Sequence, residues 1–144
     1  MKPILFLLIL ISLCKAEKNY FLEAAKYYKV PPQLLWAIAK KESKFNPNAK
    51  NKNKNGTYDI GLMQINTIHA KELWDKYKIS QKDLYNPKLN IFVGAMILEK
   101  CLKKHKNNLQ NGITCYNGRI RNNPYGKEVL ALLSKQLEIN NKGN

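Results

Sequence analysis

Glu42 is the acidic residue whose sequence context best suits acid–base chemistry. In the segment LLWAIAKKES (34–43), helical spacing places Leu35, Ile38 and Glu42 on one face, so an apolar stripe ends in a carboxylate. An apolar environment disfavours the charged form and raises a carboxyl pKa toward the range of a general acid. Three nearby lysines oppose that shift but point largely to other helix faces: Lys40, Lys41 and Lys44. We predict that Glu42 is catalytic; the structural alternative is a helix-end glutamate that reaches water.

Side chains suited to binding a sugar polymer occur beside Glu42 and further along the chain. They supply the hydroxyl, amide and aromatic groups that a glycan cleft needs, and they are Ser43, Gln64, Asn66, Tyr116 and Asn117. The segment GLMQI (61–65) also has an alternative interpretation as core packing, because three of its side chains are large and apolar.

Other catalytic machinery is sparse. The histidines are His69 and His105, in lysine-rich segments that we expect to be exposed, and no Cys/His spacing is typical of a zinc site. No G-x-S-x-G elbow or phosphate-binding glycine loop occurs, so we predict neither a metal nor a cofactor. Most of the ten acids lie on polar faces or beside lysines; Asp59, next to a polar loop, is a weak second candidate.

Residues 1–16 have the pattern of a secretory signal peptide. A lysine precedes the apolar run ILFLLILISL, and the small residues Cys14 and Ala16 follow it. We expect cleavage after Ala16, a mature domain over 17–144 and no transmembrane segment after cleavage. A lipoprotein attachment at Cys14 is the alternative, but Leu13 stands where a small residue is expected.

The chain is strongly basic, with a formal net charge of +15. Loss of the leader removes two lysines and no acid, which leaves +13. An exported protein of this charge, in the periplasm or cell envelope, is attracted to anionic wall polymers or lipid head groups. Arg119 and Arg121 are the only arginines, which disfavours nucleic acid as a partner. The alternative is a lysine- and asparagine-rich composition that merely solvates the surface.

Hydrophobic spacing predicts a single, mainly α domain of six or seven short helices. The predicted helical segments cover residues 19–28, 32–44, 67–77, 80–84, 90–104 and 125–137, with a short segment at 111–118. The last helix is marked by Tyr125, Val129, Leu130, Leu133 and Leu137. Segment 90–104 is the predicted core helix, and a small β element is expected near 55–62. Cys101 and Cys115 can form one disulfide, or they are two small buried hydrophobes.

Around Glu42 and the candidate sugar-binding residues, the sequence resembles the soluble lytic transglycosylase (SLT) family, which are peptidoglycan-cleaving enzymes of the lysozyme-like superfamily. It is most similar to small single-domain members associated with secretion and conjugation systems. The resemblance runs from about Phe21 to Leu133. Its segments, in the family's order, are AIAKKESKFNPNA, NGTYDIGLMQIN, LYNPKLNIFVGAMIL, CYNG and PYGKEVL. The implied fold is a goose-type lysozyme-like domain with a minimal β element.

The resemblance also implies roles for individual residues. Glu42 matches the family's catalytic acid, and Ser43 completes its Glu-Ser signature. Gln64 matches a cleft-lining residue, and Tyr116 matches the tyrosine whose hydroxyl lies near the catalytic acid, with Asn117 completing that pair.

Two further matches and two departures qualify this assignment. Asn90 and Ile91 match an Asn-Ile pair that we interpret as mainly structural. The family commonly reads Ala-Tyr-Asn-Ala-Gly, whereas this chain reads Cys-Tyr-Asn-Gly, so the turn after the asparagine is shorter. The cleft serine often found before Gly-Leu-Met-Gln has no clear match, and Asn55 and Thr57 are its candidate replacements.

The implied reaction cleaves the bond between N-acetylmuramic acid and N-acetylglucosamine. Glu42 would protonate the glycosidic oxygen and then, as a base, activate the muramic acid C6 hydroxyl to form a 1,6-anhydro ring. The expected partners are peptidoglycan strands and a secretion or conjugation apparatus, and the expected state is a monomer. The alternatives are a hydrolytic muramidase that uses Asp59 or another acid to place a water, and a non-catalytic, basic wall-binding assembly factor.

Overall fold

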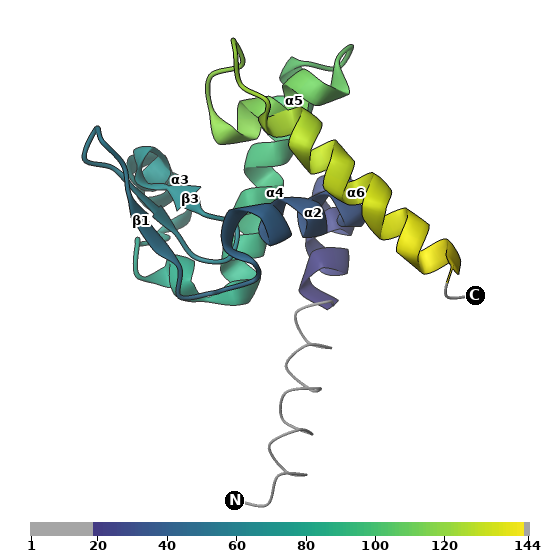
Figure 1. Ribbon diagram of the computed structural model, residues 1–144. Helices are drawn as coiled ribbons and strands as arrows, with labels where there is room; N and C mark the ends of the chain where they lie inside the picture. The colour runs from purple at the N-terminus through teal and green to yellow at the C-terminus, as the bar shows by residue number, and fades with distance from the viewer. Residues whose placement is uncertain (1–18, 143–144) are drawn as a thin grey trace, which may run out of the picture.

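The computed structural model describes residues 19–142, and the signal peptide predicted for residues 1–16 lies outside them. The elements are a helix over 19–28, α2 (Pro32–Ser43), β1 (Lys50–Lys52), β2 (Tyr58–Ile60), β3 (Ile65–Asn66), η1 (Thr67–His69), α3 (Ala70–Tyr77), η2 (Asp83–Tyr85), α4 (Pro87–Lys104), α5 (Leu109–Asn117) and α6 (Tyr125–Lys142). Helices α2, α4, α5 and α6 lie together, and the strands with α3 form a smaller lobe beside them (Figure 1). This is the mainly α architecture that the sequence predicts.

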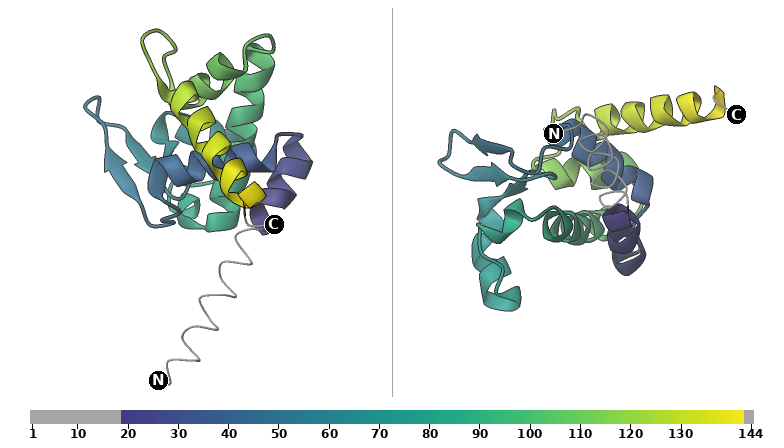
Figure 2. Two further views of the ribbon diagram at one scale, coloured as in Figure 1. Left: turned by 45° about the vertical axis from the view of Figure 1, so that its right-hand side comes forward. Right: turned by 90° about the horizontal axis from the view of Figure 1, so that it is seen from below.

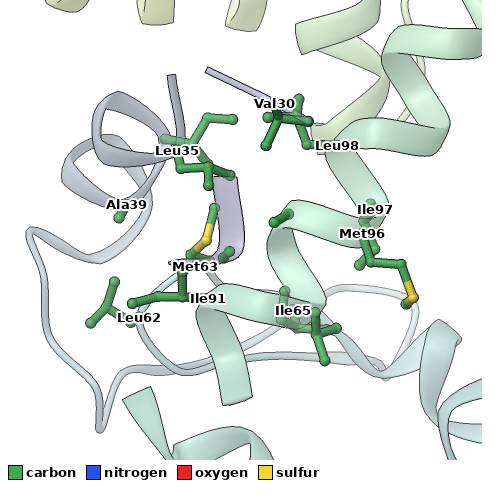
Figure 3. Packing of buried hydrophobic residues seen from close by; sticks show 14 of the residues in the cluster. Val30, Leu35, Ala39, Leu62, Met63, Ile65, Ile91, Met96, Ile97 and Leu98 are labelled. Carbon is green, nitrogen blue, oxygen red and sulfur yellow. The ribbon is translucent and has the colours of Figure 1, made fainter. Parts of the chain in front are cut away.

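Helix α4 is the centre of the hydrophobic core. Pro87 occupies its first turn, and the Asn86 side chain caps it by accepting a hydrogen bond from the Leu89 N–H at 3.0 Å. This is the core helix that the sequence predicts over 90–104, and its buried residues, which include Val93, Met96 and Ile97, extend around most of the circumference. Figure 3 shows apolar side chains from other parts of the chain, among them Leu35 and Met63, beside those of α4.

The α2 helix positions Glu42. Its apolar face is fully buried, and it ends where Lys44 adopts a left-handed conformation with φ of 53°. The Lys44 N–H donates to the Lys40 carbonyl at 3.2 Å and the Phe45 N–H donates to the Ala39 carbonyl at 3.4 Å, which satisfies the last turn of the helix. Glu42 therefore stands in the final turn, next to the strands.

The strands form an antiparallel sheet in the order β1-β2-β3. Asn51 is opposite Asp59, and Asp59 is opposite Asn66. The predicted β element near 55–62 is present, and the strands together span residues 50–66. Gly56, with φ of 84°, lies in the turn between β1 and β2. The register places a carboxylate between amide side chains.

Asn90 ties α4 to the segment after β2. Its side chain is fully buried; Oδ1 accepts from the Met63 N–H at 2.7 Å, and Nδ2 donates to the carbonyls of Ile60 and Leu84 at 2.9 and 2.8 Å. Gly61 has φ of 78°, and a Cβ there would lie 2.3 Å from Asn90 Nδ2. This geometry agrees with the structural role predicted for Asn90, and it requires glycine at position 61.

Replacing Asn90 with alanine should destabilise the fold by about 2 kcal/mol, because three buried backbone groups lose their partner. The measurement is the free energy of unfolding in urea. Asn86→Ala is the comparison variant, since it removes one exposed helix-cap hydrogen bond and should cost about 1 kcal/mol. Equal decreases in the free energy of unfolding of the two variants would contradict the role proposed for Asn90.

Cys101 of α4 and Cys115 of α5 are joined by a disulfide, with their Cα atoms 5.6 Å apart. Of the two interpretations that the sequence leaves open, the structure has the bridge. It fixes the C-terminal end of α4 against α5.

Helix α6 packs against α2 and α5, and its C-terminal end projects away from the other helices (Figure 2, right). Leu137 belongs to the predicted apolar stripe but is 48% exposed. Among residues 19–142, no helix combines the length and apolarity that crossing a bilayer requires.

Candidate active site

Glu42 faces a cleft of about 440 Å³ between the small sheet and the C-terminal parts of α4 and α5. The other polar side chains that line it are Asn53, Asp59, Gln64, Asn66, His69, Tyr116 and Asn117. Isoleucines 65, 68 and 97 and the disulfide supply apolar wall. The fold therefore brings Glu42 together with four of the five side chains predicted to bind sugar; Ser43 is not in the lining.

The Glu42 carboxyl is half-buried, and burial raises its pKa above the ordinary value of 4.5. A hydrogen bond from the Tyr125 hydroxyl to Oε1 opposes that rise, the negative charge of Asp59 adds to it, and Lys41 opposes it. The net pKa is raised, which is the sign that the apolar stripe predicts. A carboxyl of this kind holds a proton at a higher pH than an exposed one does.

The raised pKa gives a stability prediction for Glu42→Gln. Because the folded-state pKa of Glu42 exceeds its unfolded value, ionisation destabilises the fold as pH rises through that interval, and the penalty is absent below pH 4.5. The neutral glutamine avoids the penalty, so the variant should be more stable than wild type at pH 7, by on the order of 1 kcal/mol. Thermal unfolding at pH 7 and at pH 4 checks this.

Glu138→Gln is the control for that measurement, because it removes an exposed carboxylate outside the cleft and should change stability by less than about 0.5 kcal/mol. A Glu42→Gln protein that is less stable than wild type at pH 7 would show that the carboxylate is stabilising.

Tyr125 is a hydrogen-bond partner of Glu42 that the sequence analysis does not single out. It is 4% exposed at the start of α6, and its hydroxyl donates to Glu42, 83 residues earlier. Burial, followed by the nearby charge of Glu42, raises its pKa, so the hydroxyl remains a donor. Lys41 stands over the Tyr125 ring with Nζ 5.4 Å from its centroid and pairs with Glu128 at 2.5 Å. The segment PYGKEVL, which contains Tyr125, could have indicated this contact, but the sequence analysis assigns its tyrosine to the apolar stripe of the last helix.

Tyr116 lines the same cleft as Glu42, close enough for the Glu42 charge to affect its pKa, as the resemblance implies, but its hydroxyl is not hydrogen-bonded to Glu42. Its hydroxyl donates to the Met63 carbonyl at 2.7 Å, and the hydroxyl bonded to Glu42 is that of Tyr125. Burial raises the pKa of Tyr116, and the charge of Glu42 raises it further. Tyr116 therefore lines the cleft near Glu42 while fastening α5 to the loop that contains Met63.

Asp59 is a second carboxylate in the cleft. Its two oxygens accept hydrogen bonds from Asn53 Nδ2 at 3.0 Å and Asn66 Nδ2 at 2.7 Å. Its charge also contributes to the raised pKa of Glu42. The strand register, rather than a helical pattern, brings Asp59 and Asn53 to the site.

Gln64 and Ser43 make contacts within the protein. Gln64 is 8% exposed; Nε2 donates to the carbonyls of Gly61 at 2.9 Å and Ala49 at 3.3 Å, and Oε1 accepts from Asn51 Nδ2 at 2.6 Å. The Ser43 hydroxyl donates to the Leu62 carbonyl at 2.6 Å and accepts from a backbone N–H. These contacts hold the cleft loop in place and leave both side chains with little freedom to bind a ligand.

The remaining predicted residues, Asn66 and Asn117, also line the cleft. Asn66 holds Asp59 and also caps η1, because its Oδ1 accepts from a backbone N–H at 2.9 Å. Asn117 is exposed at the end of α5, which the shortened turn closes with Gly118. His69 is half-buried in the cleft, so the expectation that it is exposed is wrong. Burial lowers the His69 pKa, which favours the neutral imidazole.

The suggested replacements for the missing cleft serine do not line the cleft. Asn55 is exposed in the β1–β2 turn and accepts hydrogen bonds from the backbone and hydroxyl of Thr57. Thr57 also accepts from Asn66 at 3.2 Å. The residues of this hairpin that reach the lining are Asn53 and Asp59.

Curated proteins from Salmonella, Shigella and Escherichia are similar to this chain in sequence. Invasion protein IagB of Salmonella typhimurium is 41% identical over 95 residues, which is 65% of this chain and 59% of that protein. Protein IpgF of Shigella flexneri is 40% identical over 78 residues, 54% of this chain and 51% of that protein. X polypeptide of Escherichia coli is 37% identical over 99 residues, 68% of this chain and 57% of that protein. The match thus spans only about half the length of these relatives.

Solved structures share the fold. An inactive glutamate-to-glutamine variant of the lytic transglycosylase Slt from Pseudomonas aeruginosa superposes with a TM-score of 0.65 over 83% of this chain and 24% of that one, at 22% identity. The 70-kDa soluble lytic transglycosylase of Escherichia coli gives a TM-score of 0.57 over 81% of this chain and 18% of that one, at 27% identity. The fold is lysozyme-like. Residues 19–131 match the family described as the transglycosylase SLT domain, and the chain belongs to that family.

Proposed function

We propose that this protein is a peptidoglycan lytic transglycosylase with Glu42 as its acid and base. The observation that carries the proposal is a half-buried carboxyl with a raised pKa in a polar cleft, bonded to a tyrosine hydroxyl. Membership of the SLT family supports the reaction class.

In the proposed reaction, Glu42 first protonates the oxygen that links N-acetylmuramic acid to N-acetylglucosamine. Tyr125 occupies Oε1, so Oε2 is the oxygen available to carry that proton. The C1–O4 bond breaks, and the leaving sugar departs as an alcohol. Glu42 then takes the proton of the muramic acid C6 hydroxyl as O6 bonds to C1. Atoms balance without water, and the product carries a 1,6-anhydro end.

The residues around Glu42 divide into contact and positioning roles under this proposal. Asn66, Tyr116 and Asn117 remain our candidates for sugar contact, since they line the cleft. Gln64 also lines it, but its hydrogen bonds favour a positioning role, and Ser43 holds the loop from outside the lining.

A hydrolytic muramidase is the second candidate, because Asp59 shares the cleft with Glu42. Two amide groups hold the Asp59 carboxylate in place. A carboxylate that orients a water or stabilises an oxocarbenium ion must be held in this way. Asp59→Asn keeps the size of the side chain and removes its charge. Loss of reducing ends in the Asp59→Asn digest, with anhydro ends unchanged, would indicate that Asp59 supports hydrolysis.

The activity itself is tested by incubating the purified protein with dye-labelled, purified peptidoglycan. We expect release of soluble labelled fragments. A well-folded protein that binds the polymer and releases nothing would favour the basic wall-binding assembly factor instead.

We further infer that the protein is exported, acts in the periplasm or cell envelope as a monomer, and opens the wall locally for a secretion or conjugation apparatus. The basic charge, the predicted leader and the similarity to a protein named for invasion support this placement. In a strain that lacks the gene, assembly of one envelope-spanning apparatus should fail. Normal assembly of every such apparatus would contradict this role.

A further inference from the structure

A second groove, of about 810 Å³, lies on the N-terminal half of α4. One wall is the helix over 19–28, and the other is the segment from the end of α3 through η2. Seen from below, these two walls lie on opposite sides of α4 (Figure 2, right). The cleft around Glu42 uses the C-terminal half of α4, and the two linings share no residue.

Aromatic side chains dominate this groove. They are Tyr20, Tyr27, Tyr28, Tyr77 and Phe92. Tyr27 is 72% exposed and Tyr77 is 49% exposed, one on each wall. Tyr28 meets Tyr27 edge to face, with centroids 4.9 Å apart, which supports the Tyr27 ring in its open position.

Exposed tyrosine rings suit a sugar polymer. The ring face carries partial negative charge and is apolar, so it attracts the weakly positive C–H bonds on the face of a pyranose. The phenol hydroxyl can bond to the hydroxyls at the sugar's edge, and a rigid tyrosine loses little entropy on binding. The groove is also concave, which allows contact with both faces of a chain.

Lysines outnumber acids in the groove and at the positions next to its lining residues. Lys88 lies in it, with Nζ 5.5 Å from the Tyr20 ring centroid, and pairs with Glu23 at 2.9 Å. Four more exposed lysines adjoin lining residues in sequence, namely Lys26, Lys29, Lys78 and Lys82. The acid in the lining is Asp83, which accepts hydrogen bonds from Ser80. This excess of ammonium groups attracts a carboxylate-bearing polymer.

We propose that this aromatic groove is a second glycan-binding site that holds a peptidoglycan strand by stacking its sugar rings on Tyr27 and Tyr77. The surrounding lysines attract the carboxylates of the stem peptides. The identity of the ligand rests on the proposed function, because the substrate of the Glu42 cleft is the same polymer. A strand held outside the cleft keeps a small enzyme on an insoluble wall between cleavage events.

Co-sedimentation with purified peptidoglycan sacculi tests the proposal. All proteins carry Glu42→Gln, so that digestion does not release the bound enzyme. Adding Tyr27→Ala and Tyr77→Ala together should raise the apparent Kd on the order of tenfold, as expected for the loss of two aromatic contacts. Trp74→Ala is the matched control, since Trp74 is 53% exposed on α3 but outside the groove lining, and it should change the apparent Kd less than about twofold.

Equal binding by the double tyrosine variant and its parent would overturn the proposal. Sacculi stripped of stem peptides identify the contacted part: a tyrosine effect that persists supports stacking on sugar, and one that disappears overturns it in favour of peptide binding. Cleavage by wild type is measured separately. Tyrosine-dependent binding without cleavage would contradict the lytic activity alone, whereas cleavage without a tyrosine effect on binding would contradict the second site alone.

Discussion

Glu42→Gln should reduce the rate of peptidoglycan cleavage by at least about a thousandfold, within the range that general acid–base catalysis contributes. Glutamine keeps the size of the side chain and can still accept the Tyr125 hydrogen bond, but it can neither give nor take the proton. Because the proposed reaction uses Glu42 twice, both proton transfers fail in the same variant. The measurement is the initial rate of release of soluble fragments from labelled peptidoglycan.

Glu138→Gln is the matched control, since it makes the same chemical change at an exposed position outside the cleft and should leave the rate within about twofold of wild type. A Glu42→Gln protein with more than a tenth of the wild-type rate would show that another group carries the proton.

Tyr125→Phe should lower kcat by about ten- to a hundredfold and change the pH dependence. The Tyr125 hydroxyl orients the Glu42 carboxyl, and small errors in the placement of a catalytic group slow reactions by such factors. That hydrogen bond also lowers the pKa of Glu42, so its removal raises this pKa further. Glu42 must be protonated to act first as an acid, and the rate falls as pH rises through its pKa. The basic limb of the profile should therefore move to higher pH in Tyr125→Phe.

Tyr116→Phe separates this effect from the general loss of a cleft hydroxyl. The Tyr116 hydroxyl donates to the Met63 carbonyl, so its removal should leave the basic limb where it is in wild type. Equal movement of the limb in both variants, or none in Tyr125→Phe, would contradict the assignment of Tyr125 as the positioning residue for Glu42.

Local sequence patterns predict the helices that position this site, because hydrophobic spacing and proline positions determine where those helices form. The apolar stripe of 34–43 predicts both the α2 helix and the raised pKa of Glu42. Adjacent prolines mark the start of that helix, and the dense apolar residues of 90–104 mark the core helix. The structural role of Asn90 is implied by the family resemblance rather than by a local pattern, and its three buried hydrogen bonds agree with that role.

The partners of Glu42 depend on packing that local patterns do not contain. Tyr125 reaches Glu42 only because the start of α6 packs on α2, and its spacing in sequence is that of an ordinary core residue. Asp59 and Asn53 meet through the register of a short hairpin, which two or three residues per strand specify weakly from sequence. The sequence predicts that the Gln64 amide binds substrate, but only the fold shows that this amide donates to the backbone carbonyls of Gly61 and Ala49.

The central claim is that Glu42 cleaves the glycan with the muramic acid C6 hydroxyl as the nucleophile. Digestion of purified peptidoglycan in heavy-oxygen water, followed by mass spectrometry of the soluble products, tests it most directly. We predict muropeptides with 1,6-anhydro ends that are lighter than the reducing form by one water and carry no heavy oxygen. Reducing ends labelled with heavy oxygen would contradict the claim and identify the enzyme as a hydrolase.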